Sequence, residues 1–247
     1  MKHLPMLAAA TFATSLVATQ ADALVTHAAV PAPTLFSAAG VSSFQTLGST
    51  MGGMEVTATF AGGLTEKLTW VNGAGSFGGA TGTFWSISMN GDSFNVPFIV
   101  TNTSGAAQQG AALTNLFFDA TKGDTVFDRS FGGIEGTPGS ANGQDLFDSS
   151  GLGSGGTIAV TYQRAVAVGM NPPVGDLFGF MNVDLTGVVG GGLGIGSTWQ
   201  FIQDTDNLQV AGDIGDRPPG VIPVPAALPL LATGLAGFAF LRRRRRA

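Results

Sequence analysis

Short segments in which apolar and polar residues alternate recur along the middle of the chain, and they constrain its fold more than any other feature. In MEVTATF (Met54–Phe60), every second residue is apolar and the others are Glu or Thr. Successive side chains of a strand point to opposite faces, so this alternation predicts a strand with one buried face. Seven more segments are similar strand candidates: Lys67–Val71, Thr83–Met89, Phe94–Val100, Leu113–Ala120, Thr157–Gln163, Asp176–Leu185 and Thr198–Asp204.

Turn-forming residues separate these segments. Glycine accounts for 38 of 247 residues, and Asn-Gly pairs, which favour tight hairpin turns, begin at Asn72, Asn90 and Asn142. The stretch NGAGSFGGATG (72–82) is therefore expected to be a turn region. Pro97 predicts that its strand lies at a sheet edge or a bulge, because proline cannot complete a central ladder. Without a convincing amphipathic helix, the pattern predicts an all-β fold, an antiparallel β-sandwich or jelly-roll-like domain.

The N-terminus has the three parts of a secretory signal peptide. Lys2 and His3 form a short positive region, an apolar core follows, and Ala21 and Ala23 frame a small-residue cleavage site. Residues 1–23 are therefore expected to form a signal helix that is removed on export, with the remaining chain beginning near Leu24.

The body of the chain is acidic and contains no cysteine. Residues 24–222 include five basic and fifteen acidic residues. Such a charge balance repels nucleic acid phosphates, so nucleic-acid binding is disfavoured. The absence of cysteine excludes disulfides, thiolate catalysis and Cys-ligated zinc.

The C-terminal tail carries an uncharged stretch followed by a cluster of arginines. Val221–Leu241 has no charged residue and is long enough to cross a hydrocarbon layer of about 30 Å. Because prolines interrupt its first half, only Leu230–Leu241 is expected to be a helix, the transmembrane anchor. Residues 24–216 are expected to form the exported domain and 217–222 a Pro-rich spacer. The cytoplasmic stop consists of Arg242, Arg243, Arg244, Arg245 and Arg246.

The order of a proline box, a short apolar helix and terminal arginines resembles the PEP-CTERM sorting signal, over residues 223–247. Pro223, Val224 and Pro225 match the box, although many members carry Glu where this chain has Val224. The resemblance implies cleavage near the box by an exosortase, after transient anchoring in the inner membrane. It also implies a Gram-negative host and sorting to the cell surface or an exopolysaccharide matrix. The alternative is an ordinary C-terminal membrane anchor.

Acidic residues cluster just before the spacer and are the candidates for a metal site. Carboxylate oxygens are the hard ligands that calcium prefers. An EF-hand loop does not match, because Leu208 stands where an Asp or Asn is needed. Exposed acidic loops are the commoner explanation of such a cluster. The calcium candidates are Asp204, Asp206, Asp213 and Asp216.

The sequence also contains residues that suit a hydrolase site or a sugar-binding platform. Glycoside hydrolysis needs two carboxyl groups at a defined separation, and acids near predicted strand ends are Asp119, Asp128, Glu135, Asp145 and Asp184. A sugar-stacking platform could use the large aromatics, although residues within strand patterns are more often buried: Trp70, Trp85, Trp199 and Tyr162. His27, close to the expected cleavage point, is expected to be a solvated residue of a flexible end.

These observations predict an exported, non-enzymatic surface or matrix protein with a structural or adhesive role, and no required cofactor. Its expected partners are an exosortase, the inner membrane and an exopolysaccharide. The alternatives are a carbohydrate- or calcium-binding module and, with less support, a secreted glycoside hydrolase.

Overall fold

The computed structural model describes residues 24–33, 37–105, 111–129, 136–140, 142–152, 156–169 and 171–209. The predicted signal peptide, the Pro-rich spacer and the sorting signal lie outside the described residues, as do Ala21, Ala23, Asp213 and Asp216. The described part of the chain contains no helix with the length and hydropathy that a bilayer-spanning segment needs.

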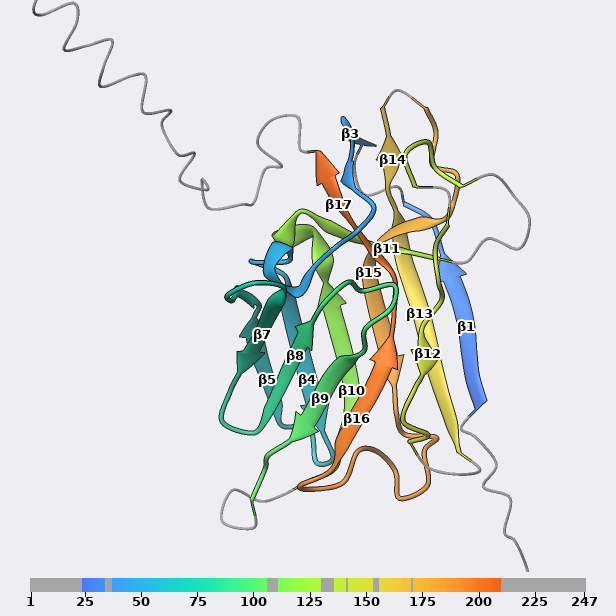
Figure 1. Ribbon diagram of the computed structural model, residues 1–247. Coiled ribbons are helices and arrows are strands. Elements are labelled where there is room, and N and C mark those ends of the chain that lie inside the picture. Colours follow the sequence, from blue (N-terminus) through green and yellow to red (C-terminus); the bar gives the residue numbers. More distant parts are fainter. Residues whose placement is uncertain are drawn as a thin grey trace, which may run out of the picture.

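The described chain is an all-β, sandwich-like domain made of two main sheets (Figure 1). The strands of the larger sheet are β1 (Leu24–Val30), β3 (Gly40–Ser43), β4 (Glu55–Phe60), β5 (Thr65–Thr69), β10 (Leu113–Asp119), β11 (Thr125–Asp128), β13 (Thr157–Ala165), β15 (Leu177–Asp184) and β17 (Thr205–Gln209). Those of the smaller sheet are β6 (Val71–Asn72), β7 (Phe77–Thr81), β8 (Trp85–Asn90), β9 (Phe98–Asn102), β12 (Phe147–Asp148) and β16 (Thr198–Ile202). A separate pair joins β2 (Ser37–Ala38) to β14 (Ala167–Val168).

The sheets are antiparallel except at two places. The N-terminal strand β1 pairs in parallel with β13, and β14 pairs in parallel with β2. Strand β15 is the centre of the larger sheet, because β13 occupies one of its edges while β10 and then β11 share the other. The short 3-10 turn η3 (Ala120–Gly123) joins β10 to β11 at this corner.

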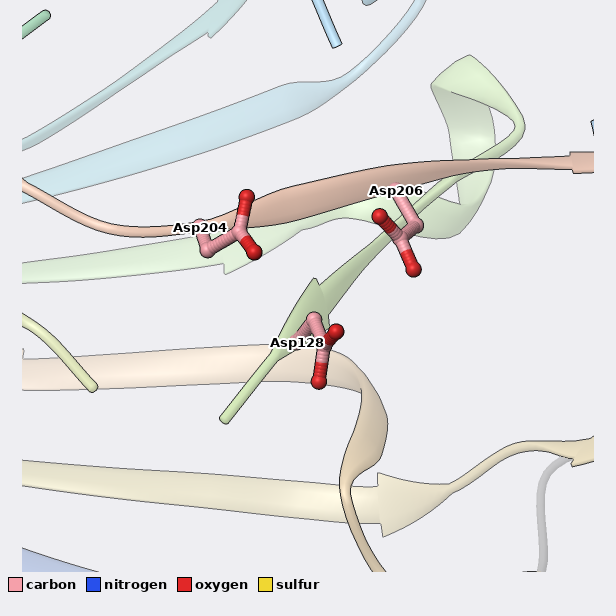
Figure 2. A group of neighbouring side chains, drawn as sticks. All are labelled: Asp128, Asp204 and Asp206. Atoms are coloured by element: carbon pink, nitrogen blue, oxygen red, sulfur yellow. The ribbon is translucent and has the colours of Figure 1, made fainter. Parts of the chain in front are cut away.

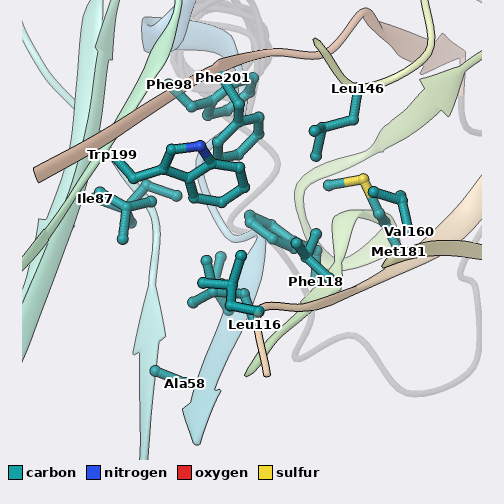
Figure 3. Packing of buried hydrophobic residues seen from close by; sticks show 14 of the residues in the cluster. Ala58, Ile87, Phe98, Leu116, Phe118, Leu146, Val160, Met181, Trp199 and Phe201 are labelled. Atoms are coloured by element: carbon teal, nitrogen blue, oxygen red, sulfur yellow. The ribbon is translucent and has the colours of Figure 1, made fainter. Parts of the chain in front are cut away.

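The hydrophobic core lies between the two sheets (Figure 3). In β4 and β8 every second residue is buried, as the alternation in the sequence predicts. Phe201 of β16 lies at the centre of an aromatic cluster. Its ring centroid is 5.1 Å from that of Phe98, 4.5 Å from that of Trp199 and 6.1 Å from that of Phe118.

Every segment predicted as a strand contains one, but two details of the prediction were wrong. Strand β9 lies between β8 and β16 rather than at an edge, and it begins at Phe98, so Pro97 precedes the ladder and does not interrupt it. The stretch 72–82, expected to be a turn region, contains β7. Gly78 of this strand serves close packing, because a Cβ there would lie 1.8 Å from the carbonyl oxygen of Gly48.

Strands β11 and β17 were not predicted at all. All four residues of β11 are buried, as are Thr205, Asp206 and Leu208 of β17. Each strand includes buried polar side chains, so neither shows a clear alternation of apolar and polar residues in the sequence. The chain enters β17 directly from β16, which belongs to the other sheet. Only Gln203 and Asp204 separate these strands, so the chain crosses between the sheets at this point.

Candidate metal centre

Three buried aspartates meet where the chain crosses between the sheets (Figure 2). Asp128 ends β11, Asp204 lies in the crossing and Asp206 lies in β17. The pairing of β11 with β17 sets their positions, because Val126 is opposite Asp206 and the Asp128 N–H donates to the Asp204 carbonyl at 3.0 Å. One carboxylate oxygen from each residue lies within 4.8 Å of the other two.

All three residues are almost completely removed from solvent. Asp206 is 0% exposed, and Asp128 and Asp204 are each 1% exposed. Buried carboxylates are costly unless hydrogen bonds or opposite charges compensate for the lost hydration. The partners of these three groups therefore decide what the cluster can do.

The hydrogen bonds to the cluster are incomplete. The Ser140 hydroxyl donates its one proton to Asp128 Oδ2. The Ser93 hydroxyl donates to Asp204 Oδ1 over a long 3.4 Å. The Ser140 hydroxyl is near enough to Asp206 to lower its pKa, but its one proton goes to Asp128, so neither carboxylate oxygen of Asp206 accepts a hydrogen bond from the described residues. Native proteins rarely leave buried polar atoms without a partner, and each exception calls for an explanation, such as an ion.

Basic side chains do not compensate for the negative charge. None of the ion pairs within the described ranges involves Asp128, Asp204 or Asp206. Arg129 follows Asp128 in the chain, but its Nε donates to Asp145 Oδ1 at 2.7 Å. Its guanidinium lies over the Tyr162 ring, 4.6 Å from the centroid. The cluster therefore has a net negative charge whenever its carboxyl groups are ionised.

The environment raises the pKa of all three carboxyl groups above the ordinary value of 3.8. Burial is the largest cause, and it raises the pKa of Asp128 to about 7, that of Asp204 to about 8 and that of Asp206 to about 6. Repulsion between neighbouring carboxylates adds to the effect of burial, since Asp206 raises the pKa of both Asp128 and Asp204. At neutral pH the cluster therefore favours bound protons or another bound cation.

A fourth buried aspartate, Asp176, lies close enough to influence the cluster but is held differently. Its carboxylate accepts hydrogen bonds from the backbone N–H and the hydroxyl of Thr137, and from the backbone N–H of Leu177. These bonds satisfy both of its oxygens. Its negative charge contributes to the raised pKa of Asp128 and of Asp206.

The surrounding backbone is arranged to hold the cluster in place. The side-chain amide of Gln203 donates to the carbonyl of Asp128 at 3.2 Å and to that of Asp204 at 2.8 Å. Gly143 leaves space for the Asp128 carboxylate, because a Cβ there would lie 2.3 Å from Asp128 Oδ1. Position 143 therefore requires glycine, because the Asp128 carboxylate approaches its backbone too closely for any side chain.

The geometry and charge fit a calcium ion. Calcium binds oxygen at about 2.3–2.6 Å, so two ligands of one ion can be separated by as much as about 5 Å. The 4.8 Å limit of the cluster falls within this range. Magnesium requires a near-ideal octahedron at about 2.0–2.1 Å and usually keeps several waters, so a buried site of protein carboxylates suits it less well than calcium. Three carboxylates supply hard oxygen ligands, and a divalent cation would neutralise most of their charge.

The structure brings together only part of the predicted calcium set. Asp204 and Asp206 lie together with Asp128, while Asp213 and Asp216 fall outside the described residues. The expectation of exposed acidic loops is wrong for Asp204 and Asp206, because β17 takes both into the interior. From the sequence alone, Asp128 is a candidate only for the acid of a glycoside hydrolase and not for a metal ligand. Its place in the cluster depends on the pairing of β11 with β17, for which the sequence offers no local signal.

The other candidates separate into different environments. All four aromatic residues proposed for a platform are buried, which confirms the expectation that strand positions bury them: Trp70, Trp85, Trp199 and Tyr162. The acids considered for glycoside hydrolysis do not gather at one place. Asp145 forms an ion pair with Arg129, whereas Asp119 lies on β10 and Asp184 on β15. Glu135 lies outside the described residues.

His27 is exposed to solvent, as expected, but it belongs to a paired strand and not to a flexible end. It lies in β1, where its Nε2 is 2.9 Å from the Leu146 carbonyl oxygen. Its ring also stacks on that of Tyr162, with the centroids 6.3 Å apart. These contacts attach the N-terminal strand to the rest of the domain.

Compared with known proteins, the chain matches no family model, no curated protein and no solved structure.

Proposed function

We propose that the domain binds a calcium ion at Asp128, Asp204 and Asp206, and that this ion stabilises the fold. The observation that carries the proposal is the carboxylate of Asp206, which is 0% exposed and has no hydrogen-bond partner among the described residues. It lies beside two further carboxylates, and none of the ion pairs in the described part of the chain involves any of the three. A cation explains this arrangement, because it would supply the missing partner and the missing charge.

The role of the ion is structural. Its ligands come from β11, from β17 and from the crossing between β16 and β17, so the ion would hold the crossing segment and the start of β17 against the end of β11. The ligands are buried, which leaves no route for a substrate to reach the metal. The same burial counts against glycoside hydrolysis at these carboxyl groups, since a sugar chain could not contact them.

Calorimetry on the full-length protein in a mild detergent tests the proposal. After removal of metals with EDTA, titration with CaCl2 is expected to show binding, and titration with MgCl2 is expected to show much weaker binding. Asp206→Asn should weaken calcium binding by at least about tenfold, since ligand charge sets affinity at such sites. Asp184→Asn, which removes an acid from the surface of β15, is the matched control and should bind as the native chain does. Absence of calcium binding by the native protein would refute the proposal.

We further propose that the protein is exported and sorted to the cell surface or the extracellular matrix, where it has a structural or adhesive role. This proposal is supported by the signal peptide pattern at residues 1–23 and by the resemblance of residues 223–247 to an exosortase signal. A calcium-stabilised domain suits such a location, because extracellular modules commonly bind calcium at about 10⁻⁴–10⁻³ M.

Mass spectrometry of the intact protein from its native host tests the sorting. A matrix form that begins near Leu24 and ends near Pro225 is the expected result. A membrane form that retains Arg242–Arg246 would instead indicate an ordinary anchor. Either result leaves the calcium proposal untouched, because that proposal depends only on the described domain.

A further inference from the structure

Six adjacent strands of the larger sheet present a continuous face on the side away from the core, here called the outer face. The strands are β1, β13, β15, β10, β4 and β5, in this order across the sheet. The register places one row of side chains across all six: Ala28, Thr161, Asn182, Phe117, Thr57 and Lys67. All six are partly or fully exposed, whereas their neighbours along the middle four strands are buried in the core.

The middle of the outer face carries a pair of partly exposed phenylalanines. Phe117 of β10 and Phe180 of β15 have ring centroids 5.7 Å apart and ring planes tilted by 44°. The two rings together form one apolar spot. Amide side chains border it, because Asn182 is directly opposite Phe117 and Gln163 is directly opposite Phe180.

An unusual backbone conformation places an arginine at the same spot. Arg164 has a φ of 59°, a left-handed conformation that non-glycine residues seldom adopt. The register of β13 with β15 is unchanged on either side of it, because Gln163 is opposite Phe180 and Ala165 is opposite Phe178. Its guanidinium lies 5.6 Å from the centroid of the Phe180 ring. Such strain is often found where a side chain is directed to a functional surface.

We infer that the outer face binds a polysaccharide chain. The apolar C–H face of a sugar ring would stack on the spot formed by Phe117 and Phe180. The hydroxyl groups at the edge of the ring would exchange hydrogen bonds with the amides of Asn182 and Gln163. An open face, unlike a pocket, accommodates a chain that continues in both directions. This inference does not depend on the metal centre, which lies in the interior of the domain.

Other occupants fit this face less well. A stable protein interface has an extended apolar core, while the apolar area here is limited to two phenylalanines surrounded by threonines and amides. Nucleic acid and anionic lipid need an excess of basic side chains. Here Lys67 is paired with Glu55 at 3.0 Å. Arg164 lies next to the Phe180 ring and Asp119 is directly opposite Phe180, so one positive and one negative charge border the spot. A neutral hydroxylated polymer therefore matches the charge of the face best.

Affinity electrophoresis of the full-length protein in a mild non-ionic detergent tests the inference. Native gels would contain hydroxyethylcellulose, dextran or alginate, and a gel without polymer would be the reference. We expect a neutral polymer to retard the native protein. Phe117→Ala and Phe180→Ala should each weaken the binding by about tenfold, because each removes one of the two stacking rings. Phe77→Ala removes a phenylalanine that is 46% exposed on the smaller sheet, and it should have no effect.

Asn182→Ala provides a second variant that leaves both rings in place, and it should also weaken the retardation. Equal retardation of the native chain and of all three outer-face variants would overturn the inference, as would no retardation in any polymer. Size-exclusion chromatography at several protein concentrations tests the remaining alternative, which is that a second copy of this chain covers the outer face. A dimer that Phe117→Ala converts to a monomer would assign the face to a second copy of this chain and would also overturn the inference.

Discussion

The side-chain amide of Gln203 donates a hydrogen bond to the carbonyl oxygen of Asp128 at 3.2 Å, and so connects the crossing between the sheets to the end of β11. The two protons of this nitrogen are shared among three carbonyls, those of Asp128, Gln144 and Asp204, while the Gln203 oxygen accepts from the Tyr162 hydroxyl. One buried side chain thus holds three backbone segments at the proposed metal centre. This network fixes the ligands before any ion binds.

Removing one negative charge from the cluster should stabilise the metal-free protein. Asp206→Asn keeps the shape of the side chain but removes the repulsion with Asp128 and Asp204. In EDTA at pH 7.5 we expect the variant to have a higher free energy of unfolding than the native chain, measured by urea denaturation. In CaCl2 the order should reverse, because only the native chain gains binding energy. A variant that is less stable than the native chain under both conditions would contradict the charge argument.

Calcium should raise the melting temperature of the native protein. A ligand present at about 100 times its Kd stabilises the folded state by roughly 2.7 kcal/mol. For a domain of this size, this corresponds to a shift of roughly 5–10 °C. Differential scanning calorimetry in CaCl2 and in EDTA measures it. A shift that persists in Asp206→Asn would place the bound calcium elsewhere.

The stability of the metal-free protein should depend on pH in a direction set by the raised pKa values. In the folded state Asp128, Asp204 and Asp206 have pKa values of about 7, 8 and 6, against 3.8 when unfolded. The folded state therefore binds more protons than the unfolded state, so stability is lost as the pH rises from about 4 to about 8. Urea denaturation in EDTA across this range checks the slope. Saturating calcium should flatten it, and a rising slope in EDTA would refute the assignment.

Gly143 should not tolerate a side chain. Gly143→Ala would place a Cβ 2.3 Å from Asp128 Oδ1, so the carboxylate or the backbone must move. We expect weaker calcium binding in calorimetry, together with a lower melting temperature. Gly194→Ala is the control, because a Cβ there would come no closer than 3.4 Å to another residue. Equal calcium affinity in both variants would show that Gly143 does not shape the site.

The aromatic cluster around Phe201 should dominate the stability of the core. Phe201→Ala removes a fully buried ring that packs against Phe98 and Trp199, and such truncations cost about 3–5 kcal/mol. Phe44→Ala removes a ring that is 65% exposed and should change the free energy of unfolding by less than about 0.5 kcal/mol. Urea denaturation in the presence of calcium compares the two. Similar losses would mean that the cluster is not the main packing centre.

The amino-acid sequence by itself determined the class of fold and the positions of most core strands. The two-residue alternation in β4, β8 and β10 could be read directly, because each of these strands has one buried face. The same alternation indicated that Trp85 and Trp199 would be buried. The predicted targeting ends also come from the sequence alone, since they lie outside the described residues.

Only the tertiary structure decided where the carboxylates and the exposed aromatics gather. Asp128 and Asp206 are far apart in the chain, and they meet because β17 adds to β11 after crossing from the other sheet. Phe117 and Phe180 form a pair only because β10 and β15 are neighbours in one register. Local patterns report which face of a strand is apolar, whereas strand pairing is a long-range outcome of how the sheets close around a shared core. A site built from paired strands therefore becomes visible only in the folded domain.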